Sequence, residues 1–165
     1  MTISTSIKLK KLSLVASFAN ELIKLRGVES GLKISISEFP VFELTTSPFR
    51  EVRGLDWRDE VEKKEKFDFI LGDFPLAWKG TEREREGYKL GAVILKVRKN
   101  WVEILKSLEH LNDNGTALYL VEPGCFRCGE GQRFEDALNS EGYFLNAVLN
   151  DPDGILKPYT AIKPV

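Results

Sequence analysis

The feature that most constrains the fold is residues 67–76, Phe-Asp-Phe-Ile-Leu-Gly-Asp-Phe-Pro-Leu. Apolar residues dominate 67–71, which predicts a buried strand, and Gly72, Asp73 and Pro75 then end it. In open α/β sheets, ligands bind at the carboxyl ends of the strands. Asp73 is therefore expected where a polar side chain can meet a ligand, although Asp and Pro are also common in ordinary turns.

Two stretches, 6–26 and 92–111, have apolar residues at three- and four-residue spacing, which predicts amphipathic helices. The expected apolar face of the first comprises Leu12, Val15, Phe18, Leu22 and Leu25. That of the second comprises Val93, Val97, Trp101, Ile104, Leu105 and Leu108, and makes Trp101 the tryptophan expected in the core. Gly27 and the turn residues 112–115 are expected to end these helices.

Strands are predicted beside the 67–71 strand at 32–37, 116–121, 143–149 and 160–165, with a short helix at 132–140. The stretch 38–66 is mixed, with a short exposed helix expected at 58–66, and 79–88 is expected to be a polar surface segment. Strands that alternate with helices favour a mostly parallel sheet. The turn at 151–154, which no helix follows, adds an antiparallel edge strand. We therefore expect one three-layer, Rossmann-like α/β domain over residues 1–165.

The composition is that of an ordinary globular protein, and the formal net charge is −1. The chain as a whole is therefore not basic, and its net charge gives no reason to expect a nucleic-acid partner. No apolar run is long enough to predict a transmembrane helix, so we expect no membrane association. Cys125 and Cys128 form a single Cys-x-x-Cys, and His110 is distant in sequence. One such pair is half of a zinc site, so we expect no metal, and structural thiols fit a reducing, cytoplasmic location.

Three later segments follow 67–76 in an informative order. They are Thr-Ala-Leu-Tyr-Leu-Val-Glu-Pro at 116–123, Leu-Asn-Ser-Glu-Gly-Tyr at 138–143, and Asp-Pro-Asp-Gly-Ile-Leu-Lys-Pro-Tyr-Thr at 151–160. Together they resemble the C-terminal half of the catalytic domain of N-6 adenine-specific DNA methyltransferases, of the modification-subunit type of type I restriction systems. The resemblance covers residues 60–165 and implies the methyltransferase variety of the Rossmann-like sheet.

In that family a strand ends in Asn/Asp-Pro-Pro-Tyr/Phe, and the motif binds a flipped adenine. The resemblance implies that Asp73 is the acidic acceptor for the adenine amino group and that Phe74 supplies a carbonyl oxygen. Pro75 matches the second proline. Leu76 stands where the family has an aromatic residue that stacks on the base, so the adenine-site motif is degenerate.

The family binds S-adenosylmethionine through a glycine-rich turn after its first strand, and this chain has no such turn. Gly27 and Gly31 follow a predicted helix and not a strand, so the resemblance implies a sheet that is incomplete at its N-terminal part. Two carboxylates correspond weakly to cofactor contacts of the family. Glu38 is placed to hold the ribose and Asp56 to contact the adenine of the cofactor, although both also fit surface positions.

Three hypotheses follow. The first is a degenerate adenine methyltransferase-like domain that binds or regulates, with DNA, another protein or the rest of a longer chain as its partner. The second is a working S-adenosylmethionine-dependent DNA adenine methyltransferase fragment whose cofactor half comes from a partner or from sequence outside this chain. The third is a generic α/β binding domain. Neither the bound cofactor nor the oligomeric state follows from the sequence.

Overall fold

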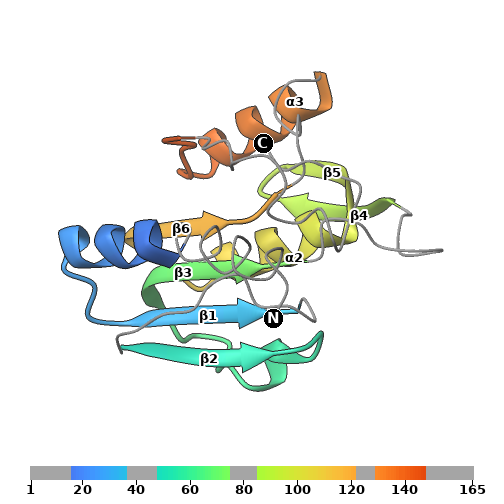
Figure 1. Cartoon of the computed structure of the whole chain (residues 1–165). Coiled ribbons are helices and arrows are strands. Elements are labelled where there is room, and N and C mark those ends of the chain that lie inside the picture. Colours follow the sequence, from blue (N-terminus) through green and yellow to red (C-terminus); the bar gives the residue numbers. More distant parts are fainter. Residues whose placement is uncertain (1–15, 37–47, 75–84, 122–128, 148–165) are drawn as a thin grey trace, which may run out of the picture. The chain divides into compact units, whose positions relative to one another are not determined.

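A computed structural model describes residues 16–36, 48–74, 85–121 and 129–147 of the chain. A helical segment at 16–26 comes first (Figure 1). The elements that follow are β1 (Gly31–Ser35), β2 (Phe49–Arg53), the 3-10 helix η1 (Trp57–Asp59), β3 (Phe67–Asp73), β4 (Arg85–Leu90), β5 (Val93–Arg98), α2 (Lys99–Leu108), β6 (Leu111–Tyr119) and α3 (Gly129–Ser140). They belong to two compact units, Met1–Pro75 with Ile104–Leu120, and Leu76–Glu103 with Val121–Val165.

The first unit is built on a four-stranded parallel sheet in the order β2-β1-β3-β6 (Figure 1). From β1 the chain moves to one side to form β2, and it then crosses to the other side of β1 to form β3 and β6. The winding therefore reverses between β1 and β3. In doubly wound sheets this switch point is where ligands bind, in the crevice outside the carboxyl ends of the strands.

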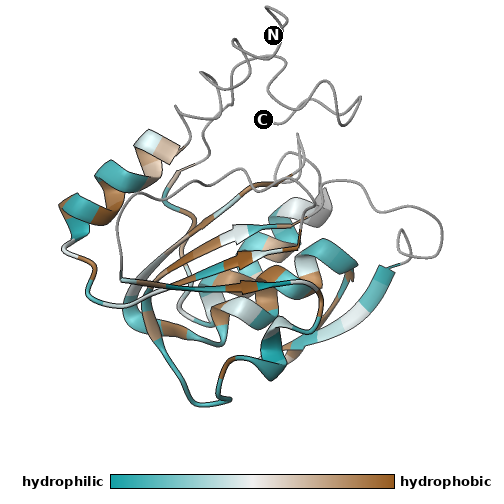
Figure 2. Cartoon of the chain, turned by 60° about the horizontal axis from the view of Figure 1, so that its bottom comes forward, coloured by the Kyte–Doolittle hydropathy of each residue, from teal (hydrophilic) through white to brown (hydrophobic). Residues whose placement is uncertain are grey.

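Helices cover both faces of this sheet. Ala19 and Ile23 of segment 16–26 form a buried cluster with Phe69 and Leu71, which alternate along β3 and so lie on one face. Tyr119 lies opposite Gly72 on the other face, where its hydroxyl contacts Ser107 of α2. The first unit thus has the three layers of a Rossmann-like α/β fold. Figure 2 shows hydrophobic stretches along the strands that lie between the helices.

The second unit contains an antiparallel ribbon of β4 and β5, together with α3. Gly91 has a φ of 55° in the turn between these strands, a conformation that glycine adopts without a steric penalty. Trp101 and Phe134 pack edge to face with ring centroids 4.6 Å apart. Buried Ala137 and Leu138 make the inner side of α3 apolar.

The predicted α/β class with a mostly parallel sheet is confirmed, but the antiparallel strands of the described residues are β4 and β5. They form a sheet of their own and are not an edge of the parallel sheet. Residues 143–147, predicted as a strand, are irregular, and 148–149 and 160–165 lie outside the described residues. Strand β2 and the brief helix η1 replace the mixed stretch and the exposed helix expected between 38 and 66.

The helix predicted at 92–111 is wrong in its first third, where the chain forms β5. Val93 and Val97 are four residues apart, a spacing that fits both one face of a helix and one face of a strand. The turn at Gly91 and three β-branched residues in β5 favour the strand. Trp101 is only half-buried, and of the two tryptophans among the described residues Trp57 in η1 is the fully buried one.

Segment 16–26 is helical as predicted, but it buries mainly a different face from the expected one. Its buried residues are Ala16, Ala19 and Ile23. Of the expected face, Leu22 is half-buried against the cluster of Ala19 and Ile23, Phe18 and Leu25 are exposed, and Leu12 and Val15 lie outside the described residues. Alanines bring the helix close to β3, because a small side chain leaves little distance between backbone and sheet. The spacing of hydrophobic residues alone does not predict which face is buried, because an analysis of spacing gives large apolar side chains more weight than alanine.

Candidate functional site

The candidate site lies at the carboxyl edge of the parallel sheet, where β1 and β3 end side by side. Ser35 and Asp73 occupy matching positions at the ends of these strands. The peptide N–H of Ile36 donates to the carbonyl oxygen of Asp73 at 3.0 Å, which continues the pairing beyond β1. The carbonyl oxygen of Ser35 accepts from the N–H of Gly54 at 3.1 Å, just after β2. Backbone hydrogen bonds therefore fix this edge across three strands.

Asp73 comes two residues after Leu71, so its side chain lies on the face that segment 16–26 covers. Asp73 is 2% exposed and takes part in an interaction within the chain. Ser35 is 5% exposed, and among the described residues its hydroxyl oxygen has no hydrogen-bond partner. Unsatisfied buried polar groups are rare in native proteins and are a reason to look for a missing water, ion or ligand. The strand ends thus combine a buried carboxylate with an unused hydroxyl.

Phe74 has a structural role that the sequence did not reveal. Its ring is 1% exposed and stacks on that of Tyr119, with centroids 6.0 Å apart and an interplanar angle of 29°. Ser107 Oγ donates to the carbonyl oxygen of Ile104 at 2.7 Å, so Tyr119 Oη donates to Ser107 Oγ, also at 2.7 Å. The Phe74 ring is therefore held in the core, where no base could stack on it.

A chain of ion pairs lies on the same sheet face as Asp73. Glu51 Oε1 bridges Lys33 Nζ at 3.1 Å and Arg53 Nη2 at 3.0 Å. Burial tends to raise the pKa of Glu51, but the hydrogen bonds and charges of Lys33 and Arg53 outweigh it and hold this pKa below its usual value. Glu51 is therefore ionised at neutral pH, and the cluster carries a net positive charge beside the acidic Asp73.

Of the other site residues predicted from the sequence, only Asp56 is among the described residues. Asp56 is exposed in the turn after β2, where its side chain makes no capping hydrogen bond to η1. It therefore follows the carboxyl end of a neighbouring strand, at the same edge of the sheet as Asp73. Glu38, Pro75 and Leu76 lie outside the described residues.

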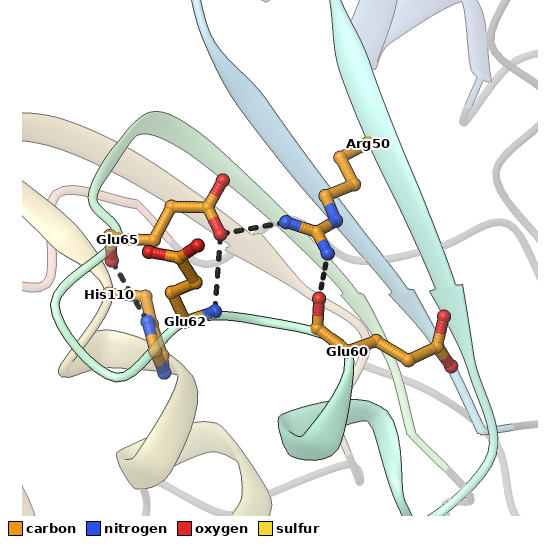
Figure 3. Close-up of polar contacts among 5 residues, drawn as sticks. All are labelled: Arg50, Glu60, Glu62, Glu65 and His110. Atoms are coloured by element: carbon orange, nitrogen blue, oxygen red, sulfur yellow. Dashed lines mark hydrogen bonds and ion pairs between the residues drawn. The ribbon is translucent and has the colours of Figure 1, made fainter.

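The opposite, amino edge of the sheet is held by polar contacts that have a structural character (Figure 3). Arg50 Nη1 donates to Glu65 Oε2 at 2.7 Å, and its other terminal nitrogen donates to the carbonyl oxygen of Glu60. His110 contacts the carbonyl oxygen of Glu65 through Nδ1 at 2.9 Å, and its ring packs against Trp57. These contacts fasten the connection between η1 and β3 and leave His110 as a core residue.

Asp68 completes the amino edge. Its Oδ2 accepts from the N–H of Ser30 at 3.1 Å and from the Ser30 hydroxyl at 2.9 Å, while its Oδ1 accepts from Asn112 Nδ2 at 2.7 Å. The Asn112 and Ser30 side chains are the main reasons that the pKa of Asp68 lies below its usual value, against the opposing effect of burial. Asp68 of β3 thus links the residue before β1, Ser30, with Asn112 of β6.

Sequence reasoning placed Asp73 but missed Ser35, Lys33 and Glu51. Their importance depends on which strands are neighbours and in what register, and a single sequence does not give strand order. The only signal was the alternation of apolar and polar residues along 32–37, which predicts a strand but not what its polar side chains contact.

Within the described residues, no three His, Cys, Asp or Glu side chains lie close enough together to hold a metal ion. Cys125 and Cys128 lie outside these residues. None of the described helices has both the length and the apolar character needed to cross a membrane.

Comparison with known proteins gives no relative on which a function could be based: no protein-family model, curated protein or solved structure matches this chain.

Proposed function

We propose that this chain is a degenerate N-6 adenine methyltransferase-like domain that binds an adenine-containing ligand and does not transfer a methyl group. The observation that carries the proposal is the position of Asp73. This buried carboxylate ends β3 next to β1, at the switch point of a parallel sheet, and the unpartnered hydroxyl of Ser35 lies at the matching position. A carboxylate can accept from an adenine amino group, and a hydroxyl can donate to a ring nitrogen.

Two features support binding without methyl transfer. Residues 36–48, which follow β1, contain no glycine, and Gly27 and Gly31, before β1 and at its first position, follow a helix. A backbone that carries Cβ atoms throughout cannot approach a cofactor as closely as a glycine turn does. In addition, Phe74 is stacked on Tyr119, and Leu76 stands where the resemblance implies an aromatic platform. The acceptor for adenine is kept, whereas the platform and the cofactor turn are not.

Calorimetric titration with adenosine and adenosine monophosphate tests the adenine-binding proposal. We expect a dissociation constant in the micromolar range, about −8 kcal/mol. Asp73→Asn keeps the shape of the side chain but replaces one acceptor oxygen with a donor. It should weaken binding about tenfold or more, since it removes a charge-assisted hydrogen bond of about 1.5–3 kcal/mol. Asp113→Asn is the matched control, because Asp113 is exposed in β6 and distant in the sheet from the carboxyl edge.

A methyl-transfer assay with radiolabelled S-adenosylmethionine and adenine-containing DNA separates the two methyltransferase-like hypotheses. We expect no transfer. Transfer that Asp73→Asn abolishes would establish the active enzyme instead. If neither adenine ligand binds, or if Asp73→Asn leaves their affinity unchanged, the proposal is wrong and a generic α/β binding domain remains.

A further inference from the structure

The β4–β5 ribbon carries its positive charges on one face. Residues directly opposite each other in an antiparallel pair share a face of the ribbon. One face is made of three such pairs: Arg85 with Arg98, Gly87 with Lys96, and Lys89 with Ile94. Every member of these pairs is exposed, and Ile94 is 73% exposed. Four of the six positions on this face are therefore solvent-facing cations.

The other face of the ribbon is apolar and partly covered. It includes buried Leu95 and half-buried Tyr88 and Val97. Glu86, the only acidic residue in either strand, also belongs to this face. The ribbon thus packs its apolar side inward and offers an outward surface on which neither strand places a carboxylate.

The cations of this face are spread along the ribbon. Arg85 and Arg98 form one row, Lys96 lies in the second and Lys89 in the third. Successive rows of the face are two residues apart, which is about 7 Å. A partner with regularly spaced negative charges can meet every row of this face, whereas a single small anion can meet only one.

We propose that this face of the β4–β5 ribbon binds the phosphate backbone of duplex DNA. Duplex DNA carries one negative charge per about 1.7 Å of its axis, so several phosphates lie within the length of the ribbon. The major groove of B-form DNA admits a two-stranded ribbon, whereas the deep and narrow major groove of duplex RNA does not. Ile94 provides an apolar contact at the end of the ribbon near the turn. This inference does not involve Asp73 and stands independently of the adenine-binding proposal.

A rival explanation is that the lysines only prevent the strand edges from pairing with other chains, as charged residues on exposed strands do. Arg85 and Arg98 have other interactions within the chain, so replacing them would disturb more than a binding face. Lys89 and Lys96 are the better probes. One acid approaches the ribbon at its turn, where Glu141 lies against Gly91, and both lysines are on the strands outside that turn.

Fluorescence polarisation with a labelled duplex of random sequence, about 20 base pairs long, tests the proposal over a series of salt concentrations. The double variant Lys89→Gln/Lys96→Gln should weaken binding by about tenfold for each lysine near 50 mM salt. The slope of log affinity against log salt should become shallower by roughly 0.9 for each lysine. A duplex RNA of the same length should bind more weakly than the DNA.

Lys63→Gln/Lys64→Gln is the control, because it removes the same charge from two exposed lysines in the turn before β3. It should leave the salt slope unchanged. The proposal is overturned if the two double variants bind alike, if wild type does not bind duplex DNA near 50 mM salt, or if RNA binds better than DNA. It is equally overturned if the ribbon variant aggregates while its DNA affinity stays that of wild type. Circular dichroism establishes that both variants are folded.

Discussion

At Gly72 the packing over β3 leaves room for a hydrogen atom and nothing larger. A Cβ atom added there would come within 2.4 Å of Tyr119 Cδ1 and 2.5 Å of Phe74 Cε2. Both atoms belong to rings that stack on each other in the core, and Tyr119 is also held by Ser107. The glycine at this position, which the sequence suggests is merely a strand ending, therefore allows two aromatic rings to cover the backbone beside Asp73.

We expect Gly72→Ala to destabilise the protein by about 1–3 kcal/mol, because overpacking forces buried side chains out of their preferred rotamers. Urea denaturation followed by tryptophan fluorescence measures the change. Gly87→Ala is the control, since its added methyl group would meet only Ile94 Cγ2 at 3.7 Å, an ordinary contact. Equal effects of the two substitutions would contradict this account of the packing.

The Asp68 carboxylate should make stability depend on pH. Because its folded-state pKa is lowered, ionised Asp68 stabilises the fold above its unfolded pKa of about 4, and this contribution disappears as the pH falls through the folded value. Asp68→Asn turns an amide group toward the donors of Ser30 and Asn112. It should cost about 1–3 kcal/mol at pH 7.

Chemical denaturation of wild type and Asp68→Asn between pH 7 and pH 3 tests this dependence. The difference in unfolding free energy should shrink steadily below about pH 4. Asp113→Asn, which changes an exposed acid of β6 next to Asn112, should show no comparable trend. A constant difference for Asp68→Asn at all pH values would mean that its charge is not what stabilises the edge.

At the scale of elements, helix 16–26 shows how size and spacing compete. Its spacing pattern favours the large residues Phe18, Leu22 and Leu25, whereas the structure buries Ala19 and Ile23 against β3 and leaves only Leu22 of the three half-buried beside them. The sequence was sufficient to predict the helix, because 3.6-residue periodicity persists over several turns. It was not sufficient to orient the helix, because the orientation depends on the shape of a sheet surface assembled from distant parts of the chain.

Ala19→Leu should therefore destabilise the protein by about 1–3 kcal/mol through overpacking. Leu25→Gln should remain within about 0.5 kcal/mol of wild type, as is usual for exposed positions. Thermal unfolding of both variants by circular dichroism distinguishes the two faces. A larger loss at Leu25 than at Ala19 would mean that the helix packs through its other side.

Stretches 92–111 and 112–115 show a second limit of local reasoning. Val93 and Val97 satisfy two periodicities at once, and only the turn at Gly91 identifies a strand. Residues 112–115 have turn chemistry but lie within β6. Phe67 of β3 pairs with Leu111 of β6, and Phe69 pairs with Thr116. Two residues along β3 therefore correspond to five along β6, and the extra residues of β6, at 112–115, form an irregularity in this strand.

For the whole molecule, the α/β class and the position of Asp73 at a strand end followed from the sequence alone. Both depend on local signals, namely the apolar run before Asp73 and the alternation of helices with strands. The switch point beside Asp73 did not follow, because strand order results from contacts between segments far apart in the chain. Ser35 gained its significance only when β1 proved to be the neighbour of β3.

The irregularity in β6 has a consequence for how copies of this protein behave toward one another. Among the described residues, β6 is the last strand in the order of the sheet, and a straight terminal strand offers a template for polymerisation. The extra residues bend and twist β6 locally, and two of them, Asp113 and Asn114, are exposed polar groups. A strand from another copy could pair in register with β6 for only a few residues, because the irregularity interrupts the regular spacing of its hydrogen-bonding groups. Residues 112–115 therefore give this end of the sheet a built-in resistance to fibril growth.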